Sequence, residues 1–386
     1  MAALNGVLPA PPGLTDYLAG FGEEPGYLDF ARLGPLSRAV AAESAAQDDA
    51  LRRARPGVFD RLQGGADRLA AAAGAVTGFR PDQVAFQPST TEGLTQALYG
   101  VTGQVLLSAS DHRALTVAAA RAADLLQTVV PVPIPTTAGR VTPGGVREAL
   151  TSSTAAVAVS AVDARTGHVV DLEGVREVIG DRLLIVDAVQ ALGAVDLPWD
   201  AADVIACGGE TWLRAGHGCA FLAVSDRAAE RLTPSLSGVG GTAIGDAAGD
   251  VVPPAGSGAA GLQLAQPDHA AASRLAAALE ELAAAGPAQV AARVLERSAR
   301  VLALADEFGL PVPSPRADGE RAGIVVVDPL PQHLTALTAA LFNHGVSVTV
   351  RDGRVRISPH AGTEEETLAM LRSALTAYSL AVRPVR

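Results

Sequence analysis

Lysine is absent from this chain of 386 residues, because all 30 of its basic residues are arginines. Lysine is the only side chain with a primary amine, so no side chain here can form a Schiff base with an aldehyde. Arginine cannot substitute, since its guanidinium stays protonated in proteins, and a hydroxyl offers no amine. Any mechanism that begins with a side-chain amine is therefore excluded.

Cysteine and long apolar segments are also scarce. The two cysteines are Cys207 and Cys219, and neither has a neighbouring ligand pair at a metal-binding spacing, so we expect two buried thiols and no metal site. No run of about 18 uncharged apolar residues is present, and the N-terminus lacks a basic segment followed by an apolar one. These features predict a cytoplasmic protein with no membrane partner.

Acidic residues outnumber basic ones by 41 to 30, which gives a net charge of −11. Nucleic acids and anionic membranes bind positively charged surfaces, so neither is expected as a partner. The composition is instead typical of an enzyme-like α/β chain rich in alanine, leucine and valine.

Apolar segments of strand length recur through the first two thirds of the chain. They cover 84–86, 105–108, 129–134, 155–162, 183–187, 204–207 and 220–224. Helical or turn segments separate them. Continuous apolar strands that alternate with helices predict an α/β fold with a mostly parallel sheet covered on both faces.

The remaining segments predict helices, loops and a smaller α+β domain. Helices are expected over 37–74 (with a break near 55–57), 93–99, 269–285, 290–308 and from 363 onward, and strands near 324–328, 346–350 and 355–358. The glycine- and proline-rich segment 238–261 predicts a mobile loop. We place an N-terminal arm and lead-in segment at 1–35, the large domain at 36–262 and the small domain at 263–386.

The most informative motif lies between Leu184 and Phe221. It reads as a strand that ends at Asp187, a turn with Gln190, a second strand, and a glycine pair followed by Glu210-Thr211-Trp212-Leu213. This order resembles the fold-type I enzymes that use pyridoxal phosphate (PLP), in particular the class V aminotransferase and cysteine desulfurase-like family. The resemblance covers nearly the whole chain. It implies a seven-stranded, mostly parallel sheet between helices, a smaller C-terminal α+β domain and a homodimer.

The resemblance also implies roles for individual residues. Asp187 would pair with the pyridinium nitrogen of PLP, Gln190 would reach the ring hydroxyl, and His112 would stack on the ring or act as an acid or base. Arg356 would hold a substrate carboxylate, for which a bidentate guanidinium is well suited.

A further turn contains Thr90 and Thr91 and would hold the cofactor phosphate. Either threonine can cap the helix that follows, which leaves free backbone N–H groups at the positive end of the helix dipole. An ordinary helix cap explains the same residues, so a phosphate site is indicated here only in combination with the neighbouring motifs.

Four positions depart from the family pattern. Thr211 stands where the Schiff-base lysine is expected, Glu210 replaces a residue that is often histidine or glutamine, Gly208 replaces a serine, and Ala164 replaces an asparagine that touches the ring hydroxyl. A carboxylate at Glu210 would repel a phosphate, at a cost of about 1 kcal/mol for charges about 4 Å apart in water and about 4 kcal/mol at an effective dielectric near 20. Alternatively, Glu210 turns onto solvent or onto Arg214.

Three functions are compatible with these residues. In the first, the cleft has been repurposed and performs acid/base chemistry on a small carboxylate-bearing or amino-acid-derived metabolite, with Asp187, Glu210, His112 and Thr211 as candidate catalytic residues and Arg356 and Gln190 as substrate contacts. In the second, the chain is a non-catalytic subunit that pairs with a lysine-bearing paralogue. In the third, PLP or pyridoxamine phosphate is held without a covalent bond. A desulfurase role is disfavoured, because it needs a cysteine nucleophile in the small domain and both cysteines precede residue 220.

Overall fold

The computed structural model describes residues 12–243 and 252–382. Its centre is a seven-stranded sheet in the order β1-β7-β6-β5-β4-β2-β3, in which β7 alone runs antiparallel to both of its neighbours. The strands are β1 (Val84–Gln87), β2 (Gly103–Leu107), β3 (Val129–Pro133), β4 (Thr154–Ser160), β5 (Leu183–Asp187), β6 (Val204–Gly208) and β7 (Ala220–Val224). The predicted mostly parallel sheet is confirmed.

Helices cover both faces of this sheet because successive strand residues point to opposite sides. In β5, for example, Leu184 and Val186 join one core cluster, whereas Leu183 and Ile185 join the other. The first face carries α3 (Val58–Thr77), α6 (Pro143–Ala149), α7 (Leu172–Ile179) and α10 (His269–Ala285). The second carries α4 (Thr90–Gly100), α5 (Arg113–Leu126), α8 (Asp226–Arg231) and α9 (Gly258–Gly261). Both faces are therefore buried, as the apolar strands require.

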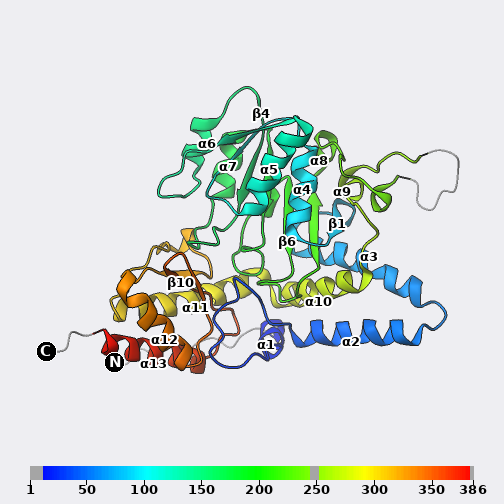
Figure 1. The fold of residues 1–386 in the computed structure, drawn as a ribbon. Coiled ribbons are helices and arrows are strands. Elements are labelled where there is room, and N and C mark those ends of the chain that lie inside the picture. The colour runs from blue at the N-terminus through cyan, green and yellow to red at the C-terminus, as the bar shows by residue number, and fades with distance from the viewer. Residues whose placement is uncertain (1–11, 244–251, 383–386) are drawn as a thin grey trace, which may run out of the picture.

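A pair of helices extends from one side of the molecule along α10 (Figure 1). They are α2 (Arg38–Arg53) and α3, and the predicted break between them is present. Ala54 ends α2 in the left-handed region at φ 44°, and Gly57 begins α3 at φ 77°. The short helix α1 (Pro12–Ala19) also packs on α10.

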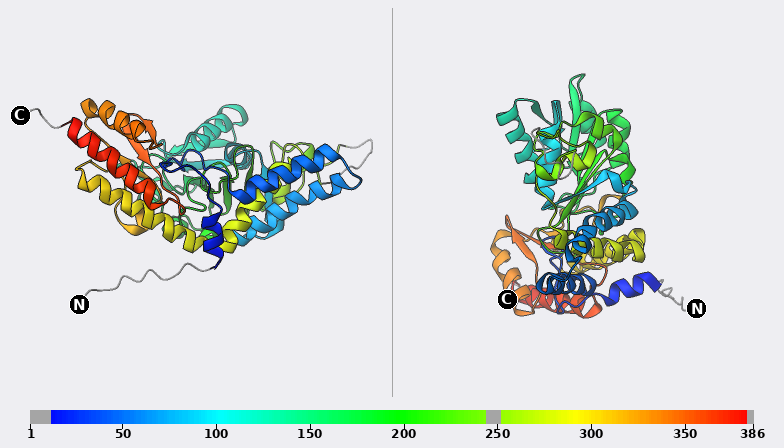
Figure 2. Two further views of the ribbon diagram at one scale, coloured as in Figure 1. Left: turned by 90° about the horizontal axis from the view of Figure 1, so that it is seen from below. Right: turned by 90° about the vertical axis from the view of Figure 1, so that its right-hand side faces the viewer.

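The small α+β region lies at the opposite end from the α2–α3 pair (Figure 2). It contains α11 (Pro287–Glu307), α12 (Leu334–Asn343), α13 (Glu365–Ala381) and an antiparallel sheet of β8 (Val325–Val327), β10 (Arg354–Ile357) and β9 (Thr349–Arg351). The lead-in segment joins this region through bridges from Tyr27 to Ser347 and from Asp29 to Ser358. The predicted domain boundaries stay a prediction, and α10 makes contacts with α2 and α3 across the one near residue 262.

Two sequence predictions differ from the structure. Helix α4 begins at Thr90 rather than at residue 93, and its cap is Ser89, whose hydroxyl accepts a hydrogen bond from the Glu92 N–H at 3.1 Å. Thr90 is the first helical residue and its buried hydroxyl makes no capping bond, so it is not the cap. The segment 238–261 contains α9 and a 3₁₀ turn at Val239–Gly241 rather than a continuous loop, and its residues 244–251 lie outside the described part.

Candidate active site

Polar side chains gather at one edge of the large sheet. The carboxyl ends of β1, β2, β4, β5 and β6 all point to this edge, because these strands share one direction. In open α/β sheets, this is the edge where ligands bind. The polar residues that end or follow these strands are Thr90, Asp111, His112, Ser160, Asp187, Glu210 and Thr211.

Asp187 ends β5 and is almost completely buried, with 1% of its side chain exposed. One carboxylate oxygen accepts a hydrogen bond from the Val189 N–H at 3.1 Å, and the other, Oδ2, has no hydrogen-bond partner among the described residues. Burial raises the pKa of Asp187 to about 7, and the negative charge of Glu210 adds to this, whereas the Val189 N–H and the nearby Ser160 hydroxyl oppose it. The carboxyl group is therefore close to half-protonated near neutral pH.

His112 lies beside this carboxylate, with 3.9 Å between its Nδ1 and Asp187 Oδ2. The residue also caps α5, because Nδ1 accepts a hydrogen bond from the Ala114 N–H at 3.3 Å. An accepting Nδ1 places the proton of the neutral ring on Nε2. Burial lowers the pKa of His112, and about half of its side chain is exposed. The ring is thus neutral at pH 7 and accessible to a ligand.

Asp111 is a site residue that the sequence did not single out. Its two carboxylate oxygens accept hydrogen bonds from the N–H groups of Ser108 and Ser160, each at 3.1 Å, and so join the ends of β2 and β4. Burial raises the pKa of Asp111 to about 6, and the charge of Asp187 contributes to this. The sequence places Asp111 in the turn between β2 and α5, but its bond to Ser160 depends on β4 lying beside β2.

Thr211 does not project an open functional group into the cleft. Its hydroxyl donates a hydrogen bond to the Val189 carbonyl at 2.7 Å, and the residue is 3% exposed. This bond ties the segment after β6 to the turn after β5. The predicted catalytic role of Thr211 is therefore not supported by its geometry, because the hydroxyl proton is already engaged with the backbone.

Replacing Thr211 with valine is expected to destabilise the protein by about 1–3 kcal/mol, because the buried Val189 carbonyl then loses its donor. Serine keeps the hydroxyl and should cost less than valine. Urea unfolding of the two variants measures the difference. Equal stability of the valine and serine variants would show that this bond contributes nothing.

Glu210 points back over Gly208 rather than outward. A Cβ atom added to Gly208 would lie 2.1 Å from Glu210 Oε2 and 2.7 Å from the Thr90 hydroxyl, so the carboxylate occupies the space of any larger residue at position 208. The predicted alternative, a contact with Arg214, is wrong, since that guanidinium binds the Pro35 carbonyl and Glu23. A larger residue at position 208 would therefore require the Glu210 side chain to move.

Thr90 lies beside this carboxylate, and its buried hydroxyl has no hydrogen-bond partner among the described residues. Thr91, the other threonine of the predicted phosphate turn, is exposed in the first turn of α4. Of the two predicted threonines, Thr90 is thus the one directed toward Glu210.

Gln190 has both ends of its amide engaged within the protein. Its Nε2 donates to the Ala31 carbonyl at 2.8 Å, and its Oε1 accepts from the Trp212 ring N–H at 3.0 Å. The structure therefore gives Gln190 a role in joining the lead-in segment to the segment after β6. A ligand contact, as predicted from the sequence, would have to use the remaining amide hydrogen or lone pair.

Arg356 on β10 reaches the same edge from the small α+β region. It donates to the Ala164 carbonyl at 3.2 Å and to the Thr349 hydroxyl at 3.3 Å, and it lies 3.8 Å from Asp29. Its Nε is buried without a partner among the described residues, and burial lowers the pKa of the guanidinium. The predicted substrate contact thus stays a prediction with a compatible location.

A model of the family described as "Aminotransferase class-V" matches residues 72–379, which is most of the chain. The chain belongs to this family. Solved structures with the same fold include an apo cysteine desulfurase from Thermococcus onnurineus NA1, with 18% identity, a TM-score of 0.81 and coverage of 94% of this chain and 95% of that one. The cysteine desulfurase CsdA from Escherichia coli has 18% identity, a TM-score of 0.76 and coverage of 96% of each chain.

A third solved structure with the same fold contains the cofactor. It is a variant of the enzyme C-DES with glycine covalently linked to its PLP cofactor, with 18% identity, a TM-score of 0.80 and coverage of 91% of this chain and 96% of that one. These likenesses establish the fold. No match is found among curated protein sequences.

The residues of this class V chain fit PLP only in part. Asp187 is suitably placed at a strand end to face a ring nitrogen, but Thr211 offers no amine and Glu210 puts a carboxylate beside the N-terminus of α4. A helix N-terminus attracts one anion, and two anions there repel each other. The phosphate of PLP therefore does not fit this cradle while Glu210 is charged.

Cys207 and Cys219 are both buried free thiols, as predicted. Among the residues at 12–243 and 252–382 there is no group of metal-binding side chains, and no helix is long and apolar enough to cross a bilayer.

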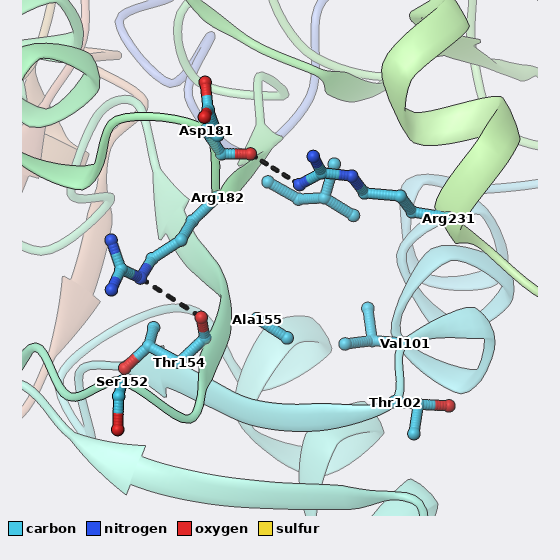
Figure 3. A pocket seen from close by; sticks show the side chains of 9 residues that line it. Val101, Thr102, Ser152, Thr154, Ala155, Asp181, Arg182 and Arg231 are labelled. Atoms are coloured by element: carbon cyan, nitrogen blue, oxygen red, sulfur yellow. Dashed lines mark hydrogen bonds between the residues drawn. The ribbon is translucent and has the colours of Figure 1, made fainter.

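A hollow of about 530 Å³ lies at the opposite edge of the sheet, where β2, β4 and β5 begin (Figure 3). Its arginines are already engaged: Arg182 donates to the Thr154 carbonyl, and Arg231 donates to the Asp181 carbonyl. The hollow thus lies apart from the candidate active site.

Proposed function

We propose that this class V chain is an enzyme that works without covalently held PLP and performs acid/base chemistry on a small carboxylate-bearing or amino-acid-derived metabolite. Elimination, isomerisation and cyclisation are the reaction classes that two proton-transfer groups serve. The observation that carries the proposal is the pair Asp187–His112. One member has a buried carboxylate oxygen without a hydrogen bond, and the other is a neutral, accessible imidazole.

The two groups have complementary proton states. Asp187 in its ionised form accepts a proton from the substrate at Oδ2, and a pKa of about 7 suits a general base at neutral pH. His112 holds its proton on Nε2 and can donate it to another substrate atom. In an isomerisation the substrate loses one proton and gains one, so the reaction needs no oxidant or reductant.

Arg356 would orient the substrate by pairing with a carboxylate after Asp29 gives way. The guanidinium already spans from β10 to the loop after β4, so a carboxylate bound there lies on the same edge of the sheet as Asp187. Non-covalent binding of PLP is less well supported, because the carboxylate of Glu210 lies beside the N-terminus of α4. Assembly as a homodimer, or as a heterodimer with a lysine-bearing paralogue, stays a prediction, as does a cytoplasmic location.

The proposal is tested by incubating the full chain, without PLP, with a panel of amino acids and carboxylic acids and following their consumption by mass spectrometry. At least one compound should be converted, and Asp187→Asn should reduce its conversion by more than a hundredfold, because the base is removed. His112→Ala should also slow it.

Asp200→Asn serves as the control, since Asp200 is exposed and outside the cleft. Turnover that appears only after PLP is added, or that survives Asp187→Asn unchanged, would contradict the proposed function.

A further inference from the structure

The cradle formed by the N-terminus of α4, Gly208 and Glu210 has an unusual set of polar atoms. Glu210 Oε2 and the Thr90 hydroxyl lie 2.1 Å and 2.7 Å from the same point, where a Cβ of residue 208 would be. Thr90 is 5% exposed, and its hydroxyl has no partner among the described residues. The side chain of Asp187 is 1% exposed, and its Oδ2 is likewise unpartnered. Buried polar atoms are normally hydrogen-bonded, so these point to a ligand.

All of these atoms can accept hydrogen bonds, and the carboxylates carry negative charge. The negative charge of Glu210 raises the pKa of both Asp187 and His112, so the three side chains are close enough to interact through their charges. Among the described residues, no cation contributes to the pKa shift of Asp187, whereas Arg351 and Arg113 act on His112. Arg214 is bound to Glu23, and Arg356 is bound at the rim near Asp29.

An ammonium group matches this arrangement. It has three donors and no acceptor, and it is attracted by two carboxylates that would repel a phosphate. The floor of the cleft is acidic, whereas Arg356 and Arg351 lie toward the small α+β region. A zwitterion therefore fits with its amine inward and its carboxylate toward the rim.

We propose that Glu210 converts the anion cradle of α4 into a subsite for a protonated amine and excludes phosphate-bearing ligands. This proposal rests on the proposed function for the location of the reacting atoms. Its tests measure binding without turnover, so the two can fail separately.

The first test compares the melting temperatures of the wild-type chain, Glu210→Gln and Glu173→Gln in inorganic phosphate, methylammonium chloride and sodium chloride at equal ionic strength. Glu173 is an exposed residue in the first turn of α7, and its change alters the net charge by the same amount. Methylammonium should stabilise the wild type and Glu173→Gln more than Glu210→Gln. Phosphate should stabilise Glu210→Gln more than the other two. If phosphate and methylammonium raise the melting temperatures of the three proteins in the same order, the proposal is overturned.

The second test restores the missing amine. Thr211→Lys and the double variant Thr211→Lys/Glu210→Gln are mixed with PLP, treated with borohydride and analysed by mass spectrometry. The double variant should reach half-maximal labelling at a PLP concentration at least tenfold lower than the single variant, because its cradle accepts the phosphate. Equal concentrations would show that Glu210 does not exclude phosphate. If Thr211→Lys does not fold, the first test decides, since it leaves Thr211 unchanged.

Discussion

Replacing Asp187 with asparagine is expected to stabilise the folded protein at pH 8 while it abolishes turnover. Burial raises the pKa of this carboxyl to about 7 in the folded state, whereas an aspartate in an unfolded chain titrates near 4. Between these values the folded state holds more protons than the unfolded state, so the free energy of unfolding falls as pH rises. Above about pH 7 the free energy of unfolding falls no further on account of Asp187, because the carboxyl group is then ionised in both states.

Asparagine has no proton to release, so the variant should lack this decline. The difference at pH 8 is on the order of 2–4 kcal/mol, since each pKa unit corresponds to about 1.4 kcal/mol and relaxation reduces the full value. Urea unfolding of both proteins at several pH values from 4 to 8 measures it. The curves should meet near pH 4 and separate toward pH 8.

Asp200→Asn provides the matched control, because this exposed aspartate undergoes the same chemical change. Its curve should follow the wild type within about 0.5 kcal/mol at every pH. A wild-type decline that persists unchanged in Asp187→Asn would mean that another group titrates, and Asp111, whose pKa burial raises to about 6, would be the next candidate.

The large sheet could be predicted from the sequence because each of its strands is a continuous apolar segment between helices. Few folds other than a sheet covered on both faces are compatible with that pattern. The direction of β7 could not be predicted from the same pattern, since an antiparallel strand buried on both faces has the same composition as a parallel one. The start of α4 was misplaced for a related reason. Ser89 and the threonines after it are all capable caps by residue type, and only the backbone shows that Ser89 is the last extended residue before the helix.

The site was predictable in location but not in detail. Asp187 and His112 lie together as expected, because the ends of neighbouring parallel strands meet at one edge. The bonds of Gln190 to Ala31 and Trp212 could not be predicted, because these partners are distant in sequence and meet Gln190 only once the lead-in segment is folded onto the turn. Asp111 was missed because its role depends on β4 lying beside β2, which no local pattern states.

Replacing Trp212 with alanine is expected to cost about 3–5 kcal/mol of stability, the largest loss we predict for a single substitution near the site. Trp212 is fully buried, its ring stacks on His360 with 5.9 Å between centroids, and it closely approaches Gly323. Its ring N–H donates to Gln190, which is left with an unsatisfied oxygen when the ring is removed. Chemical denaturation measures the loss.

Phenylalanine at the same position separates packing from hydrogen bonding. Trp212→Phe keeps most of the ring volume but removes the donor to Gln190, so about 1–3 kcal/mol should be lost. The control is Trp199→Phe, because this second tryptophan is also buried but has no side-chain hydrogen bond among the described residues. If both phenylalanine variants lose the same stability, the bond to Gln190 contributes nothing. A larger loss at Trp212 would show that the bond to Gln190 stabilises the segment that carries Glu210.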